Sequence, residues 1–284
     1  MTARLSIILA LAVLLVGCHE RPARSNVPAP RVVSYSPAIT GLIFGMGLDA
    51  HLVGVTKYCK IPPNRTDVKI VGDLARVSAE SILVVEPDVV LVQQNPADFA
   101  AVAAINPHVR IEHFTIETLA DIQEAMERIG KILSDEDSAK NVSNTFGDAL
   151  ASIRQRTAGL SRPKVLFVLG YDRPATGGSG TFIDEMIALA GATNAASSAG
   201  YAGWKTLNRE NIQAMAPDVL ICQVAPAQQN ASEQYWQSLP DLPAVKAKRV
   251  YAVTDDRWTV PSAWSAELAE KLALLVHPEL GHMP

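Results

Sequence analysis

The stretch Glu80-Ser-Ile82-Leu-Val-Val-Glu-Pro87-Asp-Val-Val90 returns later in the chain as Glu210-Asn-Ile212-Gln-Ala-Met-Ala-Pro217-Asp-Val-Leu220, without a gap. Five of the aligned positions carry the same residue, namely Glu, Ile, Pro, Asp and Val. In both copies a helix-like segment precedes a Pro-Asp turn and an apolar run, which is typical of a helix followed by a buried strand. Two copies indicate two related α/β lobes, and a ligand commonly binds in the cleft between two lobes.

The sequence around the two copies alternates in the same way. Strand-like runs are predicted at residues 31–35, 52–55, 87–92, 109–112, 165–169, 219–222 and 250–253. Helical segments lie between them, one opened by Pro37 and another capped by Ser78. Such alternation favours parallel sheets covered by helices on both faces. The expected fold class is therefore α/β, with two Rossmann-like lobes on central parallel sheets, joined by one long interdomain helix.

The region between the two halves predicts the linking helix. From Ile116 to about Leu160 the sequence lacks proline, and Ser134 is the expected N-cap of its second part. A helix from Asp135 to about Ala158 would have roughly 24 residues and a length of about 36 Å, enough to link two domains. The expected division is an N-terminal α/β lobe at 31–133, a linking helix at 134–160 and a C-terminal α/β lobe at 161–284.

The first residues have the pattern of an export signal. A short apolar run follows Arg4 and ends in Leu15-Val-Gly-Cys18, which resembles the bacterial lipobox. Residues 1–17 are therefore interpreted as a lipoprotein signal peptide, Cys18 as the lipidated residue and residues 18–30 as a flexible tether. The alternative is an ordinary secretory signal with a chance cysteine.

Composition and residue spacing exclude several classes of partner. With 25 Lys and Arg against 29 Asp and Glu, the formal net charge is −4, so we expect no nucleic-acid partner. The six histidines show no helical i, i+4 pair and no Cys/His cluster occurs, so we expect no metal site and no cofactor. Whether Cys59 and Cys222 form a disulfide stays open, because their separation cannot be read from the sequence.

Several motifs resemble the class III substrate-binding proteins of ABC importers, the family that serves vitamin B12, iron siderophores and haem. The matching motifs are Arg31-Val-Val-Ser-Tyr-Ser-Pro37, Gly54-Val-Thr-Lys-Tyr58, Pro62-Pro63, Val71-Gly72, Glu86-Pro-Asp88, Gly177-Gly-Ser-Gly-Thr181, Ala190-Gly191 with Asn194, and Ala216-Pro-Asp218. The resemblance implies a lipid-anchored monomer at the periplasmic or extracellular face of a membrane. Its expected partners are a permease and ATPase complex and a small-molecule chelate ligand.

The repeat contains one acid at the same place in each lobe. Glu80 and Glu210 lie in the first turn of their predicted helices, where an acid also complements the helix dipole. In the resembling family, glutamates at the lobe tips meet arginine pockets on the permease. The resemblance therefore implies that these two residues dock the permease.

Aromatic residues in predicted interlobe loops suggest a large, flat ligand. Tyr58, Trp204 and Trp258 fall in such loops, although burial in a core is the alternative for each. Tyr58 and Trp204 match ligand-facing residues of cobalamin-binding members, and Asp256 matches an acid in the same cleft. With the neighbouring Arg257, these five residues form the predicted ligand-binding set.

The ligand itself is less well specified than its class. Three cleft positions of the enteric cobalamin binder, occupied there by Trp, Phe and Arg, fall at Leu74, Ala175 and Val260 in this chain. The resemblance therefore favours cobalamin but leaves a ferric siderophore or haem as alternatives.

An alternative of another class is a secreted hydrolase on an α/β fold. Its support is weak, because the chain lacks a GxSxG nucleophile elbow and Cys59 has no histidine nearby in sequence. The Gly177-Gly-Ser-Gly180 run lacks the Lys-Ser/Thr of a phosphate-binding loop. We therefore expect a binding protein rather than an enzyme.

Overall fold

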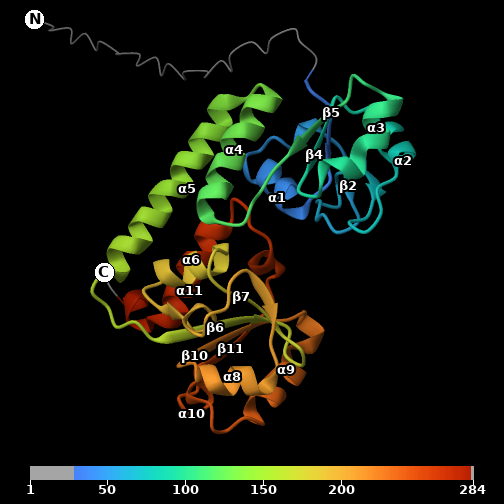
Figure 1. Ribbon diagram of the computed structural model, residues 1–284. Helices are drawn as coiled ribbons and strands as arrows, with labels where there is room; N and C mark the ends of the chain where they lie inside the picture. The colour runs from blue at the N-terminus through green and yellow to red at the C-terminus, as the bar shows by residue number, and fades with distance from the viewer. Residues whose placement is uncertain (1–28, 283–284) are drawn as a thin grey trace, which may run out of the picture.

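The computed structural model describes residues 29–282. The predicted signal peptide, Cys18 and the tether up to residue 28 lie outside the described residues. Within them the chain forms two lobes, each built on its own sheet, and two long helices run along one side of the molecule (Figure 1). These helices are α4 (Leu119–Leu133) and α5 (Glu136–Thr157).

The first lobe has a five-stranded sheet of order β3-β2-β1-β4-β5, in which all neighbouring strands are parallel. Its strands are β1 (Val32–Ser34), β2 (Leu52–Thr56), β3 (Lys69–Gly72), β4 (Val89–Val92) and β5 (Arg110–His113). Every residue of β4 is buried, because one face of the sheet packs on α1 (Pro37–Gly45) and α4. The other face packs on α2 (Ala79–Leu83) and α3 (Ala100–Ile105).

The second lobe has a six-stranded sheet of order β11-β10-β6-β7-β9, and β8 pairs with β6. Its strands are β6 (Lys164–Leu169), β7 (Ala175–Gly177), β8 (Thr193–Asn194), β9 (Trp204–Thr206), β10 (Val219–Gln223) and β11 (Val250–Val253). The strands β11, β10, β6 and β8 are parallel, whereas β7 and β9 run antiparallel along one edge. The prediction of a parallel centre is confirmed, and the antiparallel edge is an addition to it.

Helices cover both faces of this second sheet as well. They are α6 (Phe182–Leu189), α7 (Ala195–Ser198), α8 (Arg209–Met215), α9 (Gln229–Gln237), α10 (Pro243–Lys246) and α11 (Ser265–Val276). Short 3₁₀ turns complete the chain at η1 (Asp49–His51), η2 (Pro96–Phe99), η3 (Pro226–Gln228), η4 (Asp256–Thr259) and η5 (Pro278–His282). The predicted two-lobed α/β class is therefore confirmed.

The aspartate of the repeated Pro-Asp dipeptide accepts an equivalent backbone hydrogen bond in each lobe. Asp88 Oδ2 accepts a hydrogen bond from the backbone N–H of Arg31 at 2.7 Å, just before β1. Asp218 Oδ2 accepts one from the backbone N–H of Lys164 at 2.8 Å, at the start of β6. Each aspartate thus ties the start of β4 or β10 to the adjacent central strand, since an unpaired backbone N–H is costly.

The link between the lobes is helical and is packed against both of them. A Cβ on Gly130 of α4 would lie 2.3 Å from the Cβ of Ala139, so the two long helices approach closely there. Buried Phe146 and Ile153 of α5 belong to one hydrophobic cluster that includes residues of both lobes. The N-cap of α5 is Asp135, and the predicted cap Ser134 instead ends α4 with φ 57°.

Candidate ligand-binding site

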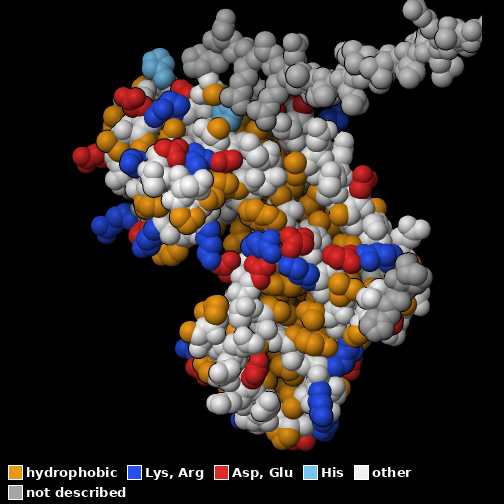
Figure 2. Space-filling view, turned by 180° about the vertical axis from the view of Figure 1, so that it is seen from behind, with side chains coloured by type: hydrophobic (Ala, Val, Ile, Leu, Met, Phe, Trp, Pro, Cys, Tyr) orange, Lys and Arg blue, Asp and Glu red, His pale blue; other side chains and the backbone are white. Residues whose placement is uncertain are grey.

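A cavity of about 530 Å³ lies between the two lobes. Its first-lobe walls come from α1 and the loop after β2, and its second-lobe walls come from the segment between β11 and α11. The lining residues are Pro37, Gly41, Tyr58, Lys60, Asp255, Asp256, Arg257, Thr259, Val260, Ser262 and Trp264. Figure 2 shows the molecule narrowing at this level, with acidic and basic side chains gathered at the waist.

The cavity lies at the carboxyl ends of strands from both sheets. The chain leaves the carboxyl ends of β1, β2 and β11 to reach Pro37, Tyr58 and Asp255 respectively. In open α/β sheets, ligands bind outside the carboxyl ends of the strands. Ser36 Oγ accepts the N–H groups of Ala38 and Ile39, so α1 begins directly at the cavity wall.

The charges that line the cavity are paired with one another. Lys60 of the first lobe forms an ion pair with Asp256 of the second, so this pair crosses the cleft. Arg257 Nη2 lies 2.7 Å from Asp255 Oδ2, and its Nη1 lies 3.1 Å from Glu267 Oε2. Hydrogen bonds from Arg257 lower the pKa of Asp255, and Asp255 in turn raises the pKa of Arg257. The lining therefore presents no free cationic group within the described residues.

The rest of the wall is largely apolar, and its largest side chain is Trp264. An ideal Cβ on Gly41 would lie 3.3 Å from Cζ3 of this ring and 3.1 Å from Cβ of Ser262, so the glycine makes room for both residues. The Ser262 hydroxyl is fully buried and has no hydrogen-bond partner among the described protein groups. A buried hydroxyl without a partner is costly.

The structure brings together three of the five predicted ligand-binding residues. Tyr58, Asp256 and Arg257 line the cavity, and the Tyr58 side chain is 52% exposed. Trp204 is 38% exposed but lies in edge strand β9, where it packs on Phe182 with the ring centroids 6.0 Å apart, and it does not line this cavity.

The structure does not place Trp258 in the wall of this cavity. Its side chain is 2% exposed and packs on Phe167 of β6, with the ring centroids 5.7 Å apart. Polar neighbours in sequence suggested a surface position, but η4 turns this ring inward to the core. Trp264, which sequence reasoning missed, provides an aromatic wall instead. Its exposure to the cavity depends on Gly41 in the other lobe, so no local signal marks it.

The predicted docking acids occupy equivalent surface positions. Glu80 is the second residue of α2 and Glu210 the second residue of α8, and both are exposed. The cysteines are both buried and free, Cys59 in the first lobe and Cys222 in the second. Burial raises the pKa of the Cys222 thiol, which makes it a poor nucleophile at neutral pH.

No helix within residues 29–282 is both long and apolar enough to span a membrane. In the same part of the chain, no three His, Cys, Asp or Glu side chains are grouped so that they could hold a metal ion.

Two α/β lobes, a connecting long helix and an interlobe cavity define the class III type of binding protein. A family model described as "Periplasmic binding protein" matches residues 32–257, and the chain belongs to this family. It is thus a substrate-binding protein of the ABC-importer type.

Relatives and solved structures agree with this assignment. A substrate-binding lipoprotein of an ABC transporter from Bacillus subtilis is 27% identical over 88% of this chain and 80% of its own. A vitamin B12-binding protein from Yersinia pestis is 27% identical over 82% of this chain and 81% of its own. The structure is similar to that of a periplasmic haem-binding protein from Roseiflexus, with a TM-score of 0.74, 27% identity, and coverage of 87% and 97%. These relatives are named as binding proteins rather than as enzymes.

Proposed function

We propose that the chain is the lipid-anchored, extracytoplasmic component of an importer that captures cobalamin in the interlobe cleft and delivers it to a permease. It would act as a monomer without catalysing a reaction. The observation that carries the ligand assignment is the pairing of the charges that line the cleft, beside the aromatic side chains of Tyr58 and Trp264. The cavity volume of about 530 Å³ falls in the range of small-molecule sites, about 300–1,000 Å³.

The pairing of the charged side chains in the cleft favours some candidate ligands over others. Haem carries propionates and many ferric siderophores are anionic, so free cationic groups in the site would favour either of them. Lys60 and Arg257, the cations that line the cleft, are both engaged by carboxylates. Cobalamin has a periphery rich in neutral amides, which need hydrogen bonds rather than a countercharge. Haem and siderophore binding remain the alternatives that the same cleft offers.

Calorimetric titration with cyanocobalamin, a ferric hydroxamate and haemin tests the ligand assignment. We expect cyanocobalamin to bind, and its affinity to fall at least tenfold, about 1.4 kcal/mol, in Tyr58→Ala. Ile105→Ala is the matched control, because Ile105 is exposed in the first lobe but does not line the cleft. If haemin or the hydroxamate binds tightly and cyanocobalamin does not bind, the cobalamin assignment is wrong and the tightly bound compound indicates the ligand class.

Glu80 and Glu210 are proposed to dock the permease. Charge-assisted contacts with permease arginines would be lost if both were changed to alanine, so transport should stop while ligand affinity in solution stays the same. A matched control replaces Glu124 and Glu233, which are also exposed acids, one in each lobe. If the Glu80/Glu210 variant loses ligand binding, these acids serve the cleft rather than the permease.

The anchor is proposed at Cys18, outside the described residues. Several acyl chains hold a protein firmly to a membrane, whereas a single chain binds weakly and reversibly. Cys18→Ala should therefore move the protein from the membrane fraction to the soluble fraction. A variant that still sediments with membranes would contradict the anchor.

A further inference from the structure

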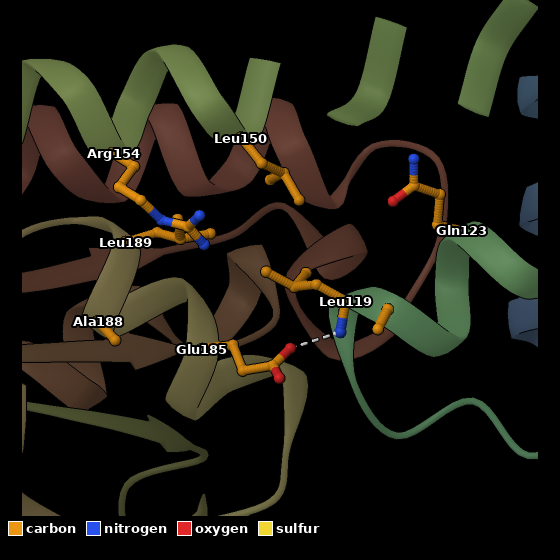
Figure 3. Close-up of a pocket in the computed structure, with 8 residues that line it drawn as sticks. Leu119, Gln123, Leu150, Arg154, Glu185, Ala188 and Leu189 are labelled. Carbon is orange, nitrogen blue, oxygen red and sulfur yellow. Dashed lines mark hydrogen bonds between the residues drawn. The ribbon is translucent and has the colours of Figure 1, made fainter. Parts of the chain in front are cut away.

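A second cavity, of about 380 Å³, lies on the helical side of the molecule. It is lined by Leu119, Ala120, Gln123, Leu150, Arg154, Glu185, Ala188 and Leu189, none of which lines the interlobe cleft. Its walls come from three helices that belong to different parts of the fold: α4 of the first lobe, the linking helix α5 and α6 of the second lobe (Figure 3).

A contact between the lobes holds this cavity together. Glu185 Oε2 of α6 accepts a hydrogen bond from the backbone N–H of Leu119 at 2.6 Å (Figure 3). Leu119 is the first residue of α4, whose N-terminal N–H groups have no partner within the helix. The carboxylate of Glu185 is therefore already engaged, and it favours a fixed arrangement of α4 against α6.

Arg154 is the positively charged residue that lines the cavity, and its side chain is exposed. The neighbouring arginine Arg156 pairs with Glu270, whereas Arg154 forms no ion pair within the part of the chain that the structure describes. Figure 3 shows the Arg154 side chain extending from α5 toward Leu189. The apolar surface that a ligand could cover beside it comes from exposed Ala120 and Ala188 and half-buried Leu150, whereas Leu119 and Leu189 are almost fully buried.

We propose that this cavity binds a monocarboxylate with a short apolar chain, a ligand class independent of the proposed cleft function. The planar Arg154 guanidinium suits a carboxylate because it can donate two parallel hydrogen bonds. The apolar chain of the ligand would cover Ala120, Leu150 and Ala188 and remove their surface from water. Such a ligand contacts both lobes and the helix between them, so it stabilises one arrangement of the lobes.

Calorimetric titration of the full chain with octanoate, acetate and octylamine tests the site. We expect octanoate to bind at least tenfold more tightly than acetate, which lacks the chain, and than octylamine, which has the opposite charge. Arg154→Gln should weaken octanoate binding at least tenfold. Lys140→Gln removes a positive charge from an exposed position of the same helix outside the cavity and should leave the affinity unchanged.

A second variant tests the cavity rather than the charge. Ala188 is an exposed lining residue, so Ala188→Phe should fill the space while the fold, checked by circular dichroism, is kept. Octanoate binding should again fall at least tenfold. The proposal is overturned if octanoate does not bind, if octylamine binds equally well, or if Arg154→Gln and Ala188→Phe leave the affinity unchanged.

Discussion

The contact between α1 and the segment before α11 is a sensitive point of the interlobe interface. Gly45 is the last residue of α1, and a Cβ there would lie only 2.4 Å from the Cβ of Ala263 in the second lobe. Carbon atoms in good contact are about 3.5–4.0 Å apart, so Gly45→Ala must push the two segments apart by more than about 1 Å. Overpacking of this kind costs about 1–3 kcal/mol, and the better helix propensity of alanine returns at most about 1 kcal/mol. We therefore expect Gly45→Ala to lower the free energy of unfolding by about 1–2 kcal/mol in guanidinium chloride titrations.

A double-mutant cycle separates this clash from other effects. Ala263→Gly removes the opposing Cβ, and the next atom near the new side chain is then the Cα of residue 263 at 3.8 Å. The double variant should therefore be more stable than the sum of the two single changes predicts, by about 0.5–3 kcal/mol. A Gly45→Ala protein as stable as the parent, or strictly additive effects, would refute the reasoning.

Further predictions concern ligand binding in the cleft, the stability that the Asp255–Arg257 pair contributes, and the link between the lobes. Trp264→Ala should weaken binding of the cleft ligand at least tenfold in calorimetry, and an unchanged affinity would mean that the ring is not part of the binding surface. Asp256→Asn frees Lys60 from its partner, so the ratio of haemin affinity to cyanocobalamin affinity should rise; a constant ratio would exclude the charge argument. Arg257 lowers the pKa of Asp255 below its ordinary 3.8, so this pair stabilises the fold above that value and the contribution is lost as the pH falls to the folded-state pKa. Urea titrations from about pH 6 to about pH 3 should therefore show a shallower acid-side loss of stability in Asp255→Asn than in the parent. Because one hydrophobic cluster spans both lobes, solution scattering curves with and without ligand should nearly coincide, and a large compaction would contradict a stiff link.

Much of the fold could be predicted from sequence, because the signals are local. The apolar runs of β4 and β10 and the Pro-Asp dipeptides before them indicated equivalent strands, and both strands occupy equivalent places beside β1 and β6. The long helix was also predicted, although its N-cap is Asp135 rather than Ser134. Caps of adjacent residues are difficult to distinguish, because Ser and Asp both cap well and the choice depends on how α4 ends.

Short strands and inward-turning loops were harder to predict. Strands β3, β7, β8 and β9 were not predicted, because each is short and is defined by its pairing rather than by its composition. Trp258 was placed in the cleft because its sequence neighbours are polar, whereas the turn η4 directs it to Phe167. A side chain's direction in a short turn follows the contacts of the whole lobe and not its sequence neighbours.

The sequence by itself determined the two-lobed α/β class and the repeated helix-strand unit, since periodicity and turns act over short distances along the chain. The cleft positions of Tyr58, Asp256 and Arg257 were implied by the resemblance to a known family rather than by such local patterns. Only the tertiary structure decided which charges pair across the lobes, that Trp264 rather than Trp258 forms the aromatic wall, and that Arg154 faces a second cavity. The physical reason is that each of these features depends on contacts between α1, α4, α5, α6 and the segment before α11. These elements are distant in sequence and meet only when the lobes pack against each other.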